Sequence, residues 1–164
     1  MTLSVKVFED NHRKGLIDLI THIQEGEFEI PLSSGQHQQL NNISSIFQKD
    51  NGNYWVAENN GKIIGSMALL DIGHNHLALR DVFVHEDYRG KEKNVSRMLL
   101  DIVLDWAKEH KITKIYLGTA PVFHAAHRYY AKNGFKEILK GELPKHFPLM
   151  DVDTKFFMYD FQES

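Results

Sequence analysis

The sequence predicts a single α/β domain spanning residues 1–164, in which helices cover both faces of one central, twisted mixed sheet. Its 164 residues, 42% of them hydrophobic, are enough for one core and too few for two comfortable ones. Stretches of alternating polarity, which are typical of strands, are interspersed with stretches of helical spacing. Their succession predicts the order β-α-α-β-β-β-α-β-α-β-β, and such an order favours a sheet covered on both sides.

The composition excludes several classes of function. A formal net charge of −3 argues against a general nucleic-acid binder. The absence of cysteine excludes disulfides, thiolate zinc sites and cysteine nucleophiles. Residues 1–10 lack the apolar core of a signal peptide, and no stretch approaches the roughly 20 apolar residues of a membrane span. We therefore expect a cytoplasmic protein with neither a membrane nor a nucleic-acid partner.

The N-terminal third predicts one strand and two helices. Leu3, Val5 and Val7 alternate with polar residues, as in a strand. Between residues 13 and 24, helical spacing relates Leu16, Ile17, Ile20 and Ile23. Ser33 and Gln36 have the spacing of a capping box, which opens a second helix. That helix would bury Leu40, Ile43 and Phe47.

Three strands are expected next, at residues 53–58, 62–70 and 76–84. Asn60-Gly61 between the first two is a strong hairpin signal, and a second turn is expected near Gly73. Apolar residues then recur at helical spacing from Val95 to Ala107, which predicts a long helix.

The C-terminal third predicts a strand at 112–118, a helix at 124–132, and strands at 135–139 and 154–161. Asn133-Gly134 is typical of the end of a helix.

The segment from Asp81 to Ser96 is the most informative for function. It reads as a strand, a polar loop containing Arg89-Gly90, and the start of the long helix. A tight loop of this kind leaves several backbone N–H groups unpaired near the positive end of the helix dipole, which suits a pyrophosphate. Taken alone, the segment is equally compatible with an ordinary strand-to-helix connection.

Two segments resemble the signatures of the GNAT acetyltransferases. Phe-Val-His-Glu-Asp-Tyr-Arg-Gly-Lys at 83–91 resembles the acetyl-CoA loop of that family. Ala-His-Arg-Tyr-Tyr-Ala-Lys-Asn-Gly-Phe at 126–135 resembles the family's A-x-x-x-Y-x-K-x-G-F signature. The resemblance covers roughly residues 60 to 140. It implies a small, bacterial-type, stand-alone N-acetyltransferase that moves the acetyl group of acetyl-CoA to a primary amine by direct attack in a ternary complex.

The resemblance also implies a cofactor site. The strand residues Val82, Phe83 and Val84 would lie along the pantetheine arm, with the backbone of Val82 and Val84 hydrogen-bonded to it. The pyrophosphate would be held by Arg89, Gly90, Lys91, Glu92, Lys93, Asn94 and Val95. Lys91, Lys93 or Lys132 would meet the 3′-phosphate, although plain solvated charge explains these lysines equally well.

The loop departs from the family's R/Q-x-x-G-x-G/A pattern, since Glu92 and Asn94 replace its two small residues. Asparagine enters left-handed conformations readily, so Asn94 is a tolerable substitute. A carboxylate of Glu92 about 5 Å from a phosphate would be repelled by roughly 3 kcal/mol, unless it faces solvent or pairs with a cation. A non-catalytic acyl-CoA binding or sensing module is therefore the alternative function.

Two residues are the candidate catalytic groups. The resemblance places Tyr130 beside the CoA sulfur. Proton transfer from a phenol to that thiolate is uphill by about 2 kcal/mol, so a hydrogen bond is the larger expected contribution. Asp81 takes the place of the family's base on the fourth strand. The alternatives are aromatic packing for Tyr130 and a salt bridge with Arg80 or another cation for Asp81. Glu58 is a weaker candidate base, for which a plain surface position is the alternative.

No metal is expected, because His74 and His76 lack an obvious third ligand. His124 and His127 flank the helix of Tyr130, where either could touch substrate. The segment 143–150 is compatible with an acceptor pocket, a dimer contact or a packed loop. The expected partners are a small-molecule or peptide amine acceptor and, from the resemblance, a second copy in a homodimer.

Overall fold

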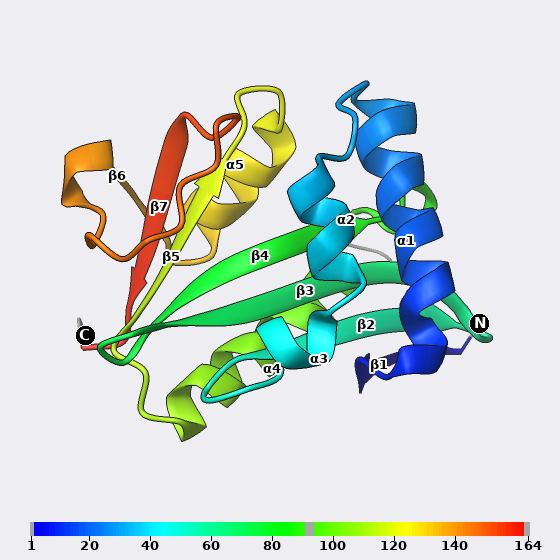
Figure 1. Ribbon diagram of the computed structural model, residues 1–164, viewed down its shortest axis with the longest axis horizontal. Helices are drawn as coiled ribbons and strands as arrows, with labels where there is room; N and C mark the ends of the chain where they lie inside the picture. The colour runs from blue at the N-terminus through cyan, green and yellow to red at the C-terminus, as the bar shows by residue number, and fades with distance from the viewer. Residues whose placement is uncertain (1, 91–93, 163–164) are drawn as a thin grey trace.

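A seven-stranded sheet forms the centre of the molecule in a computed structural model that describes residues 2–90 and 94–162 (Figure 1). The strands are β1 (Leu3–Val7), β2 (Asn53–Asn59), β3 (Lys62–Gly73), β4 (His76–Val84), β5 (Lys114–Thr119), β6 (Lys136–Ile138) and β7 (Lys155–Asp160). They lie in the order β1-β2-β3-β4-β5-β7-β6. Neighbouring strands are antiparallel except for β4 and β5, which are parallel.

Helices cover both faces of this sheet, as predicted. The helices are α1 (Arg13–Thr21), α2 (Ser34–Leu40), α3 (Ile43–Ile46), α4 (Val95–Glu109) and α5 (His124–Lys132). Single turns of 3₁₀ or π-helix also occur: η1 (Asp10–His12), η2 (His22–Glu27), η3 (Glu86–Tyr88) and η4 (Lys140–Glu142). The order of the main elements confirms the predicted α/β architecture.

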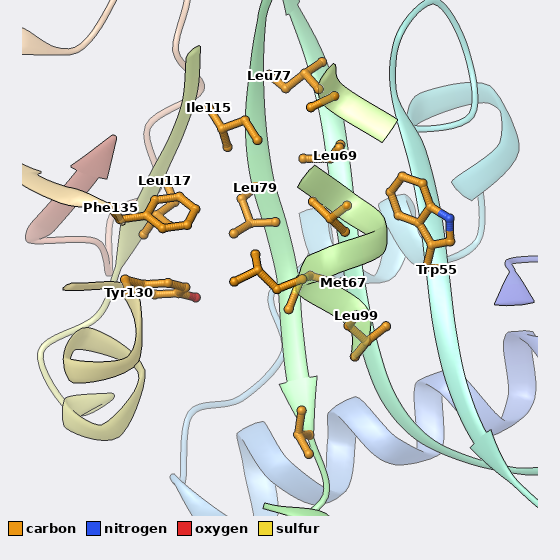
Figure 2. Close-up of a cluster of buried hydrophobic side chains, with 14 of the residues drawn as sticks. Trp55, Met67, Leu69, Leu77, Leu79, Leu99, Ile115, Leu117, Tyr130 and Phe135 are labelled. Carbon is orange, nitrogen blue, oxygen red and sulfur yellow. The ribbon is translucent and has the colours of Figure 1, made fainter. Parts of the chain in front are cut away.

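Of the three hydrophobic clusters that the described residues form, the two larger ones, one on each face, hold the layers together. On the first face, α1, α2 and α3 pack on β2 and β3 through a cluster that includes Leu16, Ile43 and Tyr54 (Figure 1). On the opposite face, α4 and α5 pack on the sheet through a cluster that includes Leu99 and Tyr130 (Figure 2). Apolar burial on both faces is the main stabilising contribution to such a fold.

Glycine and asparagine residues allow the tight β2–β3 turn and the close packing of α4 on the sheet. Asn60 and Gly61 both have positive φ, 53° and 85°, as a tight two-residue hairpin turn requires. In β3, a Cβ on Gly65 would lie 3.2 Å from side-chain atoms of both Val95 and Leu99. Gly65 therefore lets the N-terminal half of α4 approach the sheet closely.

The predicted second helix is the one clear correction. It consists of two short helices, because the chain leaves helical geometry at Asn41 and Asn42. The Asn42 side chain donates a 2.7 Å hydrogen bond to the carbonyl of Gln38, and this local bond competes with helix continuation. The capping box at its start is confirmed by reciprocal hydrogen bonds between Ser33 and Gln36.

Within the described ranges, none of the helices has both the length and the apolar character that a membrane crossing requires.

Candidate active site

A bulge in β4 positions the candidate base. Ser66 pairs with Phe83 and Ala68 pairs with Arg80, so one residue of β3 lies opposite both Asp81 and Val82. Asp81 adopts a left-handed conformation with φ of 52°, which is uncommon for a residue other than glycine. Left-handed residues in strands often mark functional sites.

The bulge turns the Asp81 carboxylate toward the face covered by α1 and α2. Its Oδ2 accepts a 2.7 Å hydrogen bond from the hydroxyl of Tyr54, which is fully buried on that face. Ser66 donates a 2.7 Å hydrogen bond to the backbone carbonyl of Asp81 and so fixes the bulge itself. Burial raises the pKa of the Asp81 carboxyl, although the charge of Arg80 and the Tyr54 hydrogen bond each lower it.

The sheet opens beside this bulge. The paired residues of β4 and β5 run from His76 with Lys114 to Ala78 with Tyr116. Beyond them β4 continues from Leu79 to Val84, while Figure 1 shows the two strands diverging. Phe83 packs on the α1 face, whereas Val82 and Val84 face the α4 cluster. The candidate pantetheine residues therefore lie on the diverging part of β4.

The loop after β4 is anchored by an ion pair that the sequence did not suggest. The guanidinium of Arg89 donates bonds of 2.6 and 2.7 Å to the two carboxylate oxygens of Glu27 in η2. Its Nε donates to the carbonyl of Val84 at 2.8 Å. Because the Arg89 side chain is already bonded to Glu27 and Val84, we expect a phosphate to be bound by backbone N–H groups near Arg89 and not by its guanidinium.

Helix α4 begins without a side-chain cap. Gly90 has φ of 102°, and Asn94 at the N-cap is left-handed with φ of 58° and makes no side-chain cap bond. The Asn94 N–H instead donates to the carbonyl of Gly90 at 3.2 Å. An uncapped N-terminus offers backbone donors to an anion. The left-handed conformation expected at position 94 is confirmed, whereas Lys91, Glu92 and Lys93 lie outside the described residues.

Tyr130 lies in α5, on the α4 side of the sheet. It is 5% exposed, and its ring packs against Phe135 and Phe157 with centroids 5.5 and 5.6 Å apart. Figure 2 shows its hydroxyl oxygen directed toward β4. Burial raises the pKa of the Tyr130 phenol well above its ordinary value. Lys132 is exposed in the last turn of the same helix.

Two more ionisable groups, Arg80 and Asp153, lie close enough to interact with each other. Arg80 Nη2 donates to Gln39 Oε1 at 3.2 Å and to Met150 Sδ at 3.3 Å. Asp153 packs against Gly118, where an added Cβ would lie 2.6 Å from its carboxylate oxygen. Burial raises the pKa of Asp153 to about 6, although Arg80 lowers it.

The remaining candidates are engaged elsewhere. Glu58 forms an ion pair with Lys6 between β1 and β2. His127 Nε2 lies 3.0 Å from the carbonyl of Ala120, and His124 is exposed. In the segment 143–150, Phe147 is buried against Phe156.

Two groups of histidines are relevant to metal binding. His146 brings its ring to within 4.7 Å of His74 and 5.7 Å of His76, between centroids. Separately, possible ligand atoms of His22, His85 and Glu86 lie within 4.8 Å of one another. The rings of His22 and His85 are stacked at 2°, so their lone pairs lie in parallel planes and do not converge on one ion. Neither group is part of the site around Asp81.

Comparison with known proteins agrees with this geometry. The family model for the acetyltransferase (GNAT) family matches residues 17–135. A GNAT-family acetyltransferase from Staphylococcus aureus superimposes with a TM-score of 0.91 at 34% identity, over 97% of this chain and 99% of that one. An acetyltransferase from Streptococcus agalactiae gives a TM-score of 0.91 at 29% identity, over 96% and 98%.

Curated relatives match over a smaller part of their length. N-acetylaspartate synthetase from Xenopus tropicalis is 34% identical over 101 residues, which are 60% of this chain and 36% of that protein. Rat N-acetyltransferase 8 is 26% identical over 134 residues, which are 78% of this chain and 60% of that protein. The chain thus spans between about a third and three-fifths of these two relatives.

The matching family model and the two superimposed structures place this chain in the acyltransferase class. More specifically, the chain belongs to the GNAT family of acetyltransferases.

Proposed function

We propose that this protein transfers the acetyl group of acetyl-CoA to a primary amine by direct attack within a ternary complex. The observation that supports this most is the bulge that holds the Asp81 carboxylate beside the point where β4 leaves β5. Family membership supplies the class of reaction, and the bulge supplies a base at the place where the reaction needs one. The acceptor is a small-molecule or peptide amine.

The donor would bind along the diverging part of β4 and the start of α4. The backbone of Val82 and Val84 would hydrogen-bond the pantetheine arm, along which Phe83 would also lie. The pyrophosphate would meet the backbone from Arg89 to Val95. The uncapped α4 and the positive φ of Gly90 support this, because both bring N–H groups toward an anion. Lys91, Lys93 and Lys132 are the candidate partners of the 3′-phosphate.

Asp81 would act as the base. An alkylamine is mostly protonated at neutral pH, and removing its proton at pH 7 costs about 4.6 kcal/mol. A carboxylate whose pKa is raised by burial is a better match for this task than an ordinary one, because its pKa is closer to the working pH. Of the described residues, none forms a salt bridge with Asp81, whose carboxylate accepts a hydrogen bond from Tyr54 and is also stabilised by the nearby charge of Arg80.

Tyr130 would stabilise the departing thiolate. Its phenol is a poorer acid than an ordinary tyrosine, because burial raises its pKa. A hydrogen bond to the developing thiolate is therefore favoured over full proton transfer.

Two further proposals concern context rather than chemistry. We infer a cytoplasmic location from the composition alone. The homodimer proposal is supported by three apolar side chains on the C-terminal segment, Leu139, Leu149 and Val152, which are 75%, 54% and 47% exposed. Light scattering on the purified protein tests the dimer, and a monomer mass at micromolar concentration would contradict it.

Initial-velocity kinetics and mass spectrometry test the mechanism. Direct attack predicts intersecting lines when acetyl-CoA and amine are varied, and an unmodified protein mass after incubation with acetyl-CoA alone. Parallel lines with an acetylated protein would contradict it. Binding of acetyl-CoA without turnover of any amine would favour the non-catalytic module.

A further inference from the structure

Arg80 is a half-buried arginine without an ion pair in the described part of the chain. Arg13, Arg89 and Arg97 each form an ion pair with a carboxylate, whereas Arg128, which also lacks one among the described residues, is exposed. Arg80 is half-buried, and its guanidinium bonds two neutral atoms, Gln39 Oε1 and Met150 Sδ. Within residues 2–90 and 94–162, it has no ion-pair partner. A guanidinium has five N–H donors in a planar fork, so two contacts from one nitrogen leave most of that fork unused.

The bulge places Arg80 and Asp81 on the same face of the sheet. Successive side chains of a regular strand point to opposite faces. In β4 this alternation fails at one point. Leu79 and Val82 face the α4 cluster, while Arg80 contacts α2 and Asp81 contacts Tyr54 on the α1 face. The cation Arg80 and the candidate base Asp81 are thus adjacent in sequence, and both side chains lie on the α1 face of the sheet.

The electrostatics of this corner are also informative. The Arg80 charge lowers the pKa of both Asp81 and Asp153, but burial outweighs it and raises both. Arg80 therefore lies close enough to influence two carboxyls without being neutralised by a direct contact. A half-buried guanidinium in this position gains most from an anion that arrives from outside.

We propose that the acceptor is a primary amine that also bears a carboxylate, as in an amino acid, and that Arg80 binds this carboxylate while Asp81 faces the amine. This inference rests on the proposed function, because it names the acceptor of that reaction. The neutral contacts to Gln39 and Met150 are those that the carboxylate would replace. Arg80 is a specificity-determining residue in this scheme, since it touches the acceptor but not the reacting atoms.

Matched acceptors separate the two parts of the proposal. The panel is the proteinogenic L-amino acids and, for each, the α-amide, which keeps the amine and loses the carboxylate charge. The best acids should exceed their amides by about 10- to 100-fold in kcat/KM, because a charged hydrogen-bonded pair contributes about that much. Arg80→Gln should raise KM for acids by a similar factor and change the amides by less than about threefold.

Two variants guard against a merely structural effect. Arg80→Lys keeps the charge and should restore part of the preference for acids. Arg128→Gln removes an exposed arginine from α5 and should leave the preference unchanged. Equal loss on acids and amides in Arg80→Gln would overturn the inference, as would amides that serve as well as acids.

A binding measurement distinguishes this inference from the proposed function. Protein saturated with CoA is titrated with the N-acetylated amino acids and with their α-amides, and no turnover is needed. Tighter binding of acids that is lost in Arg80→Gln supports the Arg80 site even if no amine is acetylated, in which case only the proposed function fails. No preference for any acid across the panel overturns the Arg80 site.

Discussion

The hydroxyl of Tyr54 donates a 2.7 Å hydrogen bond to Oδ2 of Asp81, although β3 lies between their strands. Tyr54 pairs with Ala68, and Ala68 pairs with Arg80 on the far side. The phenol can cross β3 because the side chain beneath it is only a methyl group. The base is therefore held by a residue two strands away, and this bond lowers its pKa.

Tyr54→Phe should shift the pH dependence of catalysis. Asp81 works as a base only when deprotonated, so kcat/KM rises as the pH passes through its pKa. Loss of the hydrogen bond removes an interaction that lowers this pKa, and the acid limb of the profile should move to higher pH. Asp81→Asn should lower kcat by about 10²- to 10⁴-fold at pH values above the pKa of Asp81, and the difference should shrink below it. An acid limb unchanged in Tyr54→Phe would show that another group titrates.

Tyr130→Phe and Tyr129→Phe form a matched pair in α5. Loss of the Tyr130 hydroxyl should lower kcat by about 10- to 100-fold, the contribution of a hydrogen bond to a charged group, with little change in acetyl-CoA affinity. The Tyr129 hydroxyl is buried and, within the described residues, has no hydrogen-bond partner. Tyr129→Phe should therefore leave kcat unchanged and stabilise the fold slightly. Similar kcat values for the two variants would contradict a thiolate-stabilising role for Tyr130.

The element order was predictable because periodicity and turn chemistry are local signals. Asn60-Gly61 and Asn94 were both expected in left-handed conformations, and both adopt them. The left-handed Asp81 had no such signal, since nothing in its neighbours marks a bulge. Its contact with Tyr54 depends on the strand order and on the small size of Ala68, neither of which is local.

The conformation of Asn94 gives a test of the donor loop. Asn94→Gly should retain stability and acetyl-CoA affinity, because glycine adopts positive φ without cost. Asn94→Ala should destabilise the protein by about 1 kcal/mol, the cost of a left-handed conformation for a residue with a Cβ, and should weaken acetyl-CoA binding. Thermal unfolding and calorimetric titration measure both effects. Equal acetyl-CoA affinity in the two variants would argue against phosphate binding by this backbone.

Asp153 predicts a pH dependence of stability. Burial raises its pKa from 3.8 to about 6, so the native state holds a proton that the unfolded chain has already lost. The contribution of Asp153 to the free energy of unfolding is present below about pH 4 and is lost as the pH rises to about 6. After allowance for partial solvent exposure, the loss is about 1–2 kcal/mol.

Asp153→Asn should therefore unfold at a higher temperature than the wild type at pH 7, and the difference should vanish at pH 4. Asp151→Asn is the control, because Asp151 is exposed on the same loop. A stability difference that does not change with pH would contradict the raised pKa.

The parts of the site that the sequence did not predict depend on contacts between residues that are far apart in the chain. The sequence suggests Arg80 only as a salt-bridge partner for Asp81, because nothing local marks the bulge that places both side chains on one face. Asp153 and Glu27 were not singled out, since each reaches the site from a distant segment. Sequence spacing locates the motif residues but does not show which of them the fold brings into contact.

Calorimetric titration with acetyl-CoA, followed on the same sample by CoA release over the amine panel, tests the central claim most directly. The proposed mechanism predicts micromolar binding and amine-dependent CoA release, with release abolished and binding retained in Asp81→Asn. Micromolar binding with no release for any amine would contradict a catalytic role for this chain.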